Sequence, residues 1–468
     1  MKESERLLKN SLIIAIGGIS TKMIAFFLLP LYTSILSAQD YGTFDYIISI
    51  TAFAAPVLSL LVSESMFRFL IEAGDNDEKK KRVISQSILI VIIGIVVGLI
   101  IATIFFSIKP VSYAIPLVLY CVTTIISWQM SAVLRGLGRM KEYMIYNLLV
   151  SVGIMIVNII TIVVLKWGIL GLYVGNIFPS LLISFVFIVK NKLYRYIQLK
   201  DIEKSEMKRI LHYSIHLVPN KLSWSVVDLS DRIIIMNTMG AGSNGIYSVS
   251  NKFPALINTA YGFFYTAWME SSSRILQQSE EEAERFYSKI YTEMKHLLVA
   301  LTLGMLSFMP LLNYILVNKK YWESYYYIPF LTFGMLFSNL SGIYGGIFIA
   351  HKDSKILAYS SILGAILNLV LNLLFINFFG LYAAAGATFL AYLTIYIVRL
   401  LQVKKYIHLK STPKYNIFAL IISITIVLMY YSNNIWVYGL SMATSIIFAA
   451  FTNKETLMII IKKVRKQK

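Results

Sequence analysis

Three observations predict an all-α integral membrane protein with about fourteen transmembrane helices. Hydrophobic residues make up 57% of the 468 residues and charged residues only 14%, whereas a soluble domain usually carries about 25% charged residues. The mean hydropathy of +0.69 would leave a soluble protein with more apolar surface than its core can bury. The apolar residues also gather into runs close to the roughly 20 residues that a helix needs to cross a bilayer core.

Fourteen such runs follow one another along the chain. The connections between them are short and polar, the longest being the segment 190–209, so they leave no room for a globular catalytic domain. The first run is not followed by a small-residue cleavage site, which identifies it as a first helix and not as a removed signal peptide. The predicted spans lie near residues 11–36, 41–70, 83–107, 111–134, 144–165, 169–189, 211–238, 243–270, 297–317, 325–350, 356–377, 381–401, 416–432 and 435–452.

The distribution of Lys and Arg predicts that both termini are cytoplasmic. Most of the 43 basic residues fall in alternate connections and at the two ends of the chain. Such an excess of positive charge marks the cytoplasmic side of a membrane protein. The linker 190–209 and the C-terminal tail are expected to form short basic helices on the membrane surface. The opposite side has only Lys109, Lys166, Lys319 and Lys320.

Composition and motifs exclude several function classes. The net charge of +19 is explained by basic loops that contact anionic membrane lipid, and not by nucleic-acid binding. The single cysteine, Cys121, excludes a disulfide framework and a multi-cysteine metal site. The five histidines lack metal-ligand spacing, and the chain contains no P-loop, GxSxG or HExxH motif. We therefore expect no cofactor, no metal and no catalytic residues.

An internal repeat divides the chain into two similar halves. Residues 7–46 align without gaps on residues 210–249, an offset of 203 that pairs Gly42 with Gly245. Six spans separate the two copies, so both halves have the same orientation, as in transporters built from parallel repeats. The predicted organisation is an N-lobe (1–189, spans 1–6), a cytoplasmic linker (190–209), a C-lobe (210–401, spans 7–12), and a final segment (402–468) with spans 13 and 14 and the basic tail.

Charged residues inside the spans gather in the four spans that the repeat pairs. A charge at the middle of a bilayer costs about 2.5–3.5 kcal/mol, so deep charges should face the protein interior or an aqueous cavity. The four deepest cations indicate a central cavity that handles an anion, although ion pairing among all nine charges is the alternative explanation. These nine residues are Lys22, Asp45, Glu64, Arg68, Lys221, Asp228, Asp231, Arg232 and Lys252.

Helical spacing predicts which of these charges meet. Lys221, Asp228 and Arg232 fall on one face of the seventh span, where Asp228 and Arg232 are four residues apart and can pair. Glu64 and Arg68 have the same spacing, and a salt bridge near the cytoplasmic surface would explain them equally well.

Four stretches resemble the Wzx-type polysaccharide flippases of the multidrug/oligosaccharidyl-lipid/polysaccharide exporter superfamily. Two of them are equivalent turns of the repeat, a third is the basic connection after span 4, and the last contains Asn368, Asn372 and a Gly380…Gly386 turn. The stretches are ILSAQDYGTFDYIISI (35–50), AGSNGIYSVSNKFPALI (241–257), VLRGLGRMKEYMIYNLL (133–149) and LGAILNLVLNLLFINFFGLYAAAGATFLAY (363–392).

The resemblance implies a MATE-like fold, in which two six-helix lobes surround a central cavity and two C-terminal helices are added. It implies translocation of undecaprenyl-pyrophosphate-linked oligosaccharide repeat units across the bacterial cytoplasmic (inner) membrane by alternating access, for O-antigen or capsule synthesis. The prenyl tail would stay in lipid between the lobes. H⁺ or Na⁺ are the implied coupling ions, and polysaccharide polymerase and assembly proteins the implied partners.

The resemblance also assigns roles to the charged residues. Lys22, Lys221, Arg232 and Lys252 would contact the pyrophosphate, with Arg68 as a further substrate-binding residue. The acids Asp45, Glu64, Asp228 and Asp231 would hold a coupling ion or form structural ion pairs.

Four other functions can be weighed against the sequence. A peptidoglycan lipid-precursor flippase shares the pyrophosphate-prenyl group and the fourteen-helix plan. A multidrug or organic-cation antiporter of the same superfamily would need acids deep in the first lobe, where the first span carries Lys22 and no acid. A membrane enzyme such as a polymerase or ligase would need a large outer loop with catalytic residues, and the outer connections are short. A scaffold role would leave the buried charges unexplained.

Overall fold

The computed structural model describes residues 26–198, 203–407, 413–454 and 458, and every regular element among them is helical. The chain divides into two compact units, Met1–Gly245 (unit 1) and Ile246–Lys468 (unit 2). The lobe boundaries at 189/190 and 209/210 stay a prediction.

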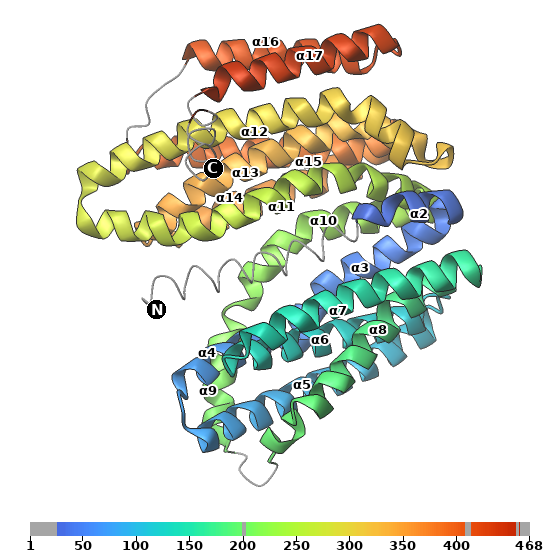
Figure 1. Ribbon diagram of the computed structural model, residues 1–468, viewed down its shortest axis with the longest axis vertical. Helices are drawn as coiled ribbons and strands as arrows, with labels where there is room; N and C mark the ends of the chain where they lie inside the picture. The colour runs from blue at the N-terminus through green and yellow to red at the C-terminus, as the bar shows by residue number, and fades with distance from the viewer. Residues whose placement is uncertain (1–25, 199–202, 408–412, 455–457, 459–468) are drawn as a thin grey trace, which may run out of the picture. The chain divides into compact units, whose positions relative to one another are not determined.

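Unit 1 is a bundle of long helices (Figure 1). The helix α3 packs on α5, α6, α8 and α10, while α4 packs on α5, α6 and α9. The elements are α2 (Leu29–Ile35), α3 (Ala38–Ser59), α4 (Val62–Glu72), α5 (Asp77–Ile108), α6 (Ala114–Gly136), α7 (Met140–Asn158) with its π-helical continuation (Ile159–Val164), α8 (Ile169–Lys190), a 3-10 turn (Leu193–Tyr196), α9 (Lys204–Ile215) and α10 (Val218–Thr238).

Unit 2 is built around three mutually packed helices, α13, α14 and α15. The helix α12 packs on α13 and also on α16 and α17, which lie side by side along one edge of the unit (Figure 1). The elements are α11 (Gly240–Gln278), which begins in unit 1, α12 (Glu280–Leu316), a 3-10 segment (Lys319–Tyr327), α13 (Ile328–Ala350), α14 (Ser354–Phe379), α15 (Leu381–Val403), α16 (Pro413–Tyr430) and α17 (Ile435–Thr452).

Eleven helices of the described part are long and apolar enough to cross a membrane. They correspond to predicted spans 2–6 and 9–14, which confirms a multi-pass helical membrane protein. Predicted spans 7 and 8 are the helices α10 and α11, which fall outside these eleven. Most of predicted span 1 lies outside the described residues, so the total of fourteen and the cytoplasmic termini remain predictions.

Equivalent turns of the two halves share local features, a capping hydrogen bond in one case and a glycine conformation in the other. The N-cap Asn76 of α5 accepts a hydrogen bond from the amide of Lys79, and the N-cap Ser279 of α12 accepts one from Glu282. Both pairs fit the offset of 203. Gly168 before α8 and Gly380 before α15 have nearly identical conformations, with φ/ψ of 58°/−130° and 55°/−134°. The repeat therefore extends well beyond the aligned segment.

The span 2 and span 8 regions differ from their predicted boundaries. Span 2 is broken into α3 and α4, because Leu60 and Leu61 both adopt the left-handed conformation. Span 8 belongs to a long helical hairpin, in which α11 and α12 are separated by Ser279 alone. The polar segment between spans 8 and 9 is therefore helical and not an irregular connection.

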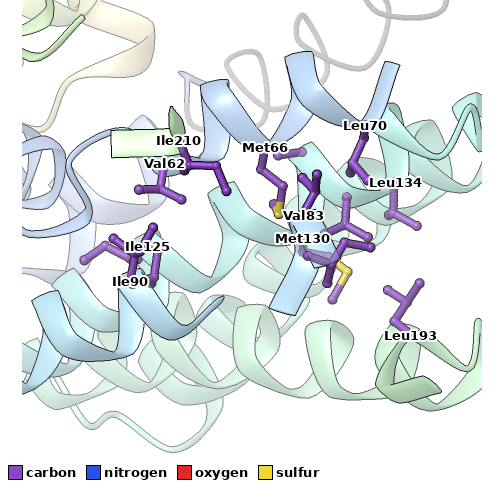
Figure 2. Close-up of a cluster of buried hydrophobic side chains, with 14 of the residues drawn as sticks. Val62, Met66, Leu70, Val83, Ile90, Ile125, Met130, Leu134, Leu193 and Ile210 are labelled. Atoms are coloured by element: carbon purple, nitrogen blue, oxygen red, sulfur yellow. The ribbon is translucent and has the colours of Figure 1, made fainter. Parts of the chain in front are cut away.

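A buried apolar cluster packs α4, α5 and α6 of unit 1 together. Figure 2 shows side chains of α4, α5 and α6 converging, with Leu193 and Ile210 packed at its edge. Val62, Met66 and Leu70 follow the i, i+4, i+8 spacing that places them on one face of α4. This packing fixes the surfaces of α4 and α6 that face the cavity described next.

Candidate functional site: a cationic and aromatic cavity in unit 1

A cavity of about 540 Å³ lies in unit 1 between α4, α6, α7 and the start of α10. Its wall combines two cations, one carboxylate, two serine hydroxyl groups and three aromatic rings, one of them a tyrosine. Aliphatic side chains complete it. The lining residues are Leu61, Ser63, Glu64, Phe67, Trp128, Ser131, Ala132, Arg135, Tyr143, Leu217 and Lys221.

One face of α6 supplies a third of this wall. Trp128, Ser131 and Arg135 are three and four residues apart, so they project from the same side of the helix. The helix ends directly below them at Gly136, where the amide of Arg139 bonds the carbonyl of Leu134 at 2.9 Å. This Schellman-type ending fixes the turn that starts α7.

Arg135 is the most constrained cation of the cavity. Its guanidinium carbon lies 4.1 Å from the ring centroid of Phe67 and 5.7 Å from that of Tyr143, positions that allow cation–π attraction. Its Nε is buried and has no hydrogen-bond partner among the described residues. A buried donor without a partner costs about 1–3 kcal/mol, and an anionic ligand in the cavity would provide the missing acceptor.

Lys221 reaches the cavity from the first turn of α10 and is exposed. No ion pair of Lys221 is seen within the described part of the chain. Glu64, also exposed, contributes the single carboxylate. Two cations against one acid give the cavity an excess of positive charge, while its three rings offer flat apolar surfaces. The wall can therefore bind an anion joined to a ring-shaped or apolar group.

A second charged site, a buried ion pair, joins α3 and α10. The Nε of Arg232 donates to Oδ2 of Asp45 at 3.3 Å, and the two side chains are 9% and 8% exposed. Asp231 beside them is also buried. Along α10, Arg232 is about 16 Å from Lys221 at 1.5 Å per residue, so the structure does not bring these two predicted ligands together.

The other predicted charges occupy separate places. Arg68 donates to the Tyr213 hydroxyl at 3.3 Å and lies over that ring, so its partner is on α9 and the predicted pairing with Glu64 is not formed between these two described side chains. Lys252 is partly buried on α11 in unit 2. Lys22 and the side chain of Asp228 lie outside the described residues.

A separate apolar groove of about 530 Å³ runs between α12, α13, α15 and α16 in unit 2. Along α16 it extends from Tyr415 to Tyr431, about 24 Å at 1.5 Å per residue. One end carries Lys295, which is 7% exposed and donates to Oδ1 of Asn416 at 2.9 Å. Phe333 and Phe337 line the middle.

The sequence reasoning did not select Arg135 or Lys295. Both lie near the ends of spans, where basic residues were attributed to membrane topology. A signal for Arg135 was present in the spacing of Trp128, Ser131 and Arg135, which places an aromatic ring, a hydroxyl and a cation on one helix face. Lys295 had no such signal, because its neighbours Asn416 and Tyr415 are far away in the chain.

Comparisons with known proteins agree with this architecture. A family model described as polysaccharide biosynthesis protein matches residues 7–276, more than half of the chain. An uncharacterized membrane protein of Methanocaldococcus jannaschii is 24% identical over 426 residues, which cover 86% of this chain and 99% of that protein.

Solved structures share the fold at low sequence identity. Lipid II flippase MurJ in an inward closed conformation aligns with a TM-score of 0.72 and 15% identity, over 97% of this chain and 100% of that one. An inward-facing multidrug resistance MATE family transporter aligns with a TM-score of 0.68 and 15% identity, over 84% and 97%. The predicted MATE-like fold is therefore confirmed, and by its family match this chain belongs to the polysaccharide biosynthesis protein family of membrane proteins.

Proposed function

We propose that this protein is a flippase that moves undecaprenyl-pyrophosphate-linked oligosaccharide units across the bacterial cytoplasmic membrane for surface polysaccharide synthesis. The unit 1 cavity is the observation that carries the proposal. Its combination of Arg135, Lys221 and three aromatic rings suits a ligand that joins a pyrophosphate to sugar rings. Family membership supports the polysaccharide pathway, and the fold supports alternating access as the transport mechanism.

Each part of the cavity has a role in this proposal. Arg135 is held between Phe67 and Tyr143 with its Nε unsatisfied, so it can donate to a phosphate oxygen without losing another hydrogen bond. Lys221 is exposed, and its flexible four-carbon side chain can reach a charge in the cavity. Trp128 offers a flat surface to a sugar ring. Glu64 accepts hydrogen bonds from sugar hydroxyls or holds a coupling ion.

The apolar groove of unit 2 supports a prenyl-linked substrate. Its length of about 24 Å exceeds the thickness of one leaflet, which is half of a bilayer core of about 30 Å. A long polyisoprenoid chain can lie in it with its contacts to Phe333 and Phe337 replacing contacts to lipid. The groove offers the tail of such a substrate a protein surface in addition to lipid.

The proposal is tested in a strain that lacks this gene and carries plasmid-borne variants. Arg135→Ala and Lys221→Ala should reduce surface polymer and cause lipid-linked repeat units to accumulate on the cytoplasmic side, at unchanged membrane abundance. Arg135→Lys keeps the charge but loses the planar donor set, so it should retain partial function. Lys289→Ala, at an exposed lysine of α12, is the matched control and should behave as wild type.

The alternatives predict different results in the same strains. Normal surface polymer in the deletion strain contradicts the proposal. If the deletion instead causes loss of viability with accumulated peptidoglycan precursor, the lipid-precursor alternative is correct. If it changes only sensitivity to cationic drugs, the antiporter alternative is correct.

A further inference from the structure

The break in span 2 is a strained feature at the wall of the cavity. Leu60 and Leu61 have φ angles of 49° and 52°, a left-handed conformation that a leucine rarely adopts. The two residues end α3 and start α4. Leu61 itself lines the cavity, together with Ser63 and Glu64 from the first turn of α4. The strain is thus located where the proposed ligand binds, as is common at functional sites.

The equivalent span in the other half of the repeat is unbroken. At the offset of 203, Leu60 and Leu61 correspond to Phe263 and Phe264, which lie inside the continuous helix α11. The helix caps Asn76 and Ser279 correspond at the same offset. Span 2 therefore contains no inserted or deleted residue relative to span 8. Its length does not force the break, and a continuous helix of the same length is compatible with the fold.

The neighbouring helix α5 is adapted to the broken form. A Cβ atom on Gly94 would lie 1.9 Å from the backbone carbonyl oxygen of Leu58, in the last turn of α3. A side chain at position 94 is therefore incompatible with this geometry. The residue equivalent to Gly94 in the other half is Leu297 of α12, which is 37% exposed. The close approach that requires a glycine beside the broken span is therefore not matched by a glycine at the equivalent position of α12.

A proline weakens the helical hydrogen bonding near the end of α3. Pro56 has no amide hydrogen, so it leaves the carbonyl of Ala52 without its helical partner. The hydroxyl of Ser225 in α10 lies 3.5 Å from that carbonyl oxygen. The residue equivalent to Pro56 in α11 is Thr259, which can donate its amide.

We propose that span 2 switches between the broken helix seen here and a continuous helix, and that the cavity binds its ligand only in the broken form. In a continuous span, Leu61, Ser63 and Glu64 would rotate with α4 relative to α3 and the wall they form would be lost. This inference rests on the proposed function only for the identity of the ligand. The switch itself follows from Leu60, Leu61 and Gly94.

The switch is tested by measuring the length of span 2 with paired spin labels. The labels are placed at Gln39 and Glu72, both exposed, in a Cys121→Ser background that removes the single native cysteine. A continuous helix would separate these positions by about 50 Å, and the broken form by less. We expect both distances in the full-length protein in nanodiscs. The matched control pair, Gly242 and Ile275 in α11, should give the long distance alone.

Two opposite variants should move the populations in opposite directions. Leu60→Gly with Leu61→Gly relieves the left-handed strain and weakens a continuous helix, so the short distance should gain about tenfold or more. Gly94→Leu copies the other half of the repeat and clashes with the Leu58 carbonyl, so the long distance should dominate. The apparent Tm of both variants is first checked against that of wild type, so that a change in distance is not caused by unfolding. A single distance that neither variant changes overturns the proposal.

Measuring the two distances after adding lipid-linked oligosaccharide tests the switch and the proposed function independently. Enrichment of the short distance by the ligand in wild type, but not in Gly94→Leu, supports both. If the two distances are present and the variants move them, but the ligand has no effect, the switch stands and the proposed ligand of this cavity is wrong.

Discussion

The Asp45–Arg232 pair shows what a single buried contact contributes. Removing one partner leaves the other charge in a site where both side chains are less than 10% exposed. We expect Arg232→Ala to lower the free energy of unfolding by about 3–5 kcal/mol, because it breaks a buried ion pair. The double variant Asp45→Ala/Arg232→Ala should cost less than the sum of the single variants. Thermal unfolding of the purified variants measures this, and additive losses would show that the two residues act separately.

Gly42 and Gly245 allow backbones to approach more closely than any side chain permits. A Cβ on Gly42 would lie 1.8 Å from the carbonyl oxygen of Ala241, and one on Gly245 would lie 2.0 Å from that of Ala38. The pattern is reciprocal, since Ala38 and Ala241 are also equivalent in the repeat. We expect Gly42→Ala to lower the apparent Tm clearly. Gly262→Ala, where no other atom lies within 4 Å, is the control, and equal Tm values for the two would contradict the contact.

Residue-scale features were partly accessible to sequence reasoning. The repeat identified Gly42 and Gly245 as equivalent, and the cost of burying charge singled out Arg232, whereas Asp45 was expected near the outer end of its span. Their pairing was not predicted, because helical spacing ranks partners within a helix and says nothing about partners on different helices. For the same reason Arg232 was assigned a neighbour four residues away, at Asp228.

At the scale of elements, one arginine ties three helices of unit 2 together. Arg399 of α15, 2% exposed, donates to the hydroxyls of Ser360 and Ser361 at 3.0 and 3.1 Å and to the carbonyl of Ser341 at 3.2 Å. These partners belong to α14 and α13. The cost of burying the guanidinium is offset only while all three acceptors remain in place.

This arrangement predicts an asymmetric mutational response. Ser360→Ala with Ser361→Ala should destabilise the protein strongly, because the buried guanidinium loses two acceptors while its charge remains. Arg399→Met removes the charge and fills the space, so we expect it to cost less than the double serine variant. Apparent Tm values in one detergent provide the comparison. A smaller loss in the double serine variant would show that Arg399 does not depend on these hydroxyls.

Element boundaries were predicted well where apolar runs are bounded by polar residues, as for α6 and α8. They were wrong for span 2, because the break at Leu60–Leu61 lies inside an apolar stretch and has no glycine to mark it. The length of α11 and α12 was also missed. Beyond the apolar run, each helix carries ion pairs between residues four apart, Arg274–Glu270 in α11 and Arg285–Glu281 in α12. These pairs support the helical conformation there.

At the scale of the whole molecule, the charge distribution predicts the orientation in the membrane. Cysteines introduced at Lys319 and Lys320, in the Cys121→Ser background, should react with an impermeant thiol reagent added outside intact cells. Cysteines at Lys79 and Lys80 should react only after the membrane is opened. The opposite labelling pattern would reverse the assignment of the two sides.

The architecture was the most predictable property, because bilayer thickness and the positive charge bias act on every span at once. The cavity was the least predictable. Its wall comes from four helices separated in the chain. Tryptophan and tyrosine occur at many positions of the sequence, so nothing marks Trp128 and Tyr143 as lining residues. Only the packing of α4, α6, α7 and α10 selects them.

The central claim is tested most directly with the purified protein in proteoliposomes that contain a fluorescent undecaprenyl-pyrophosphate oligosaccharide. An impermeant reagent that modifies the sugar reports how much substrate has reached the opposite leaflet. We predict translocation with wild type and Lys289→Ala, and at least a tenfold lower rate with Arg135→Ala and Lys221→Ala together, since about 1.4 kcal/mol corresponds to a factor of ten. Equal translocation by wild type, the double variant and protein-free vesicles would contradict the claim.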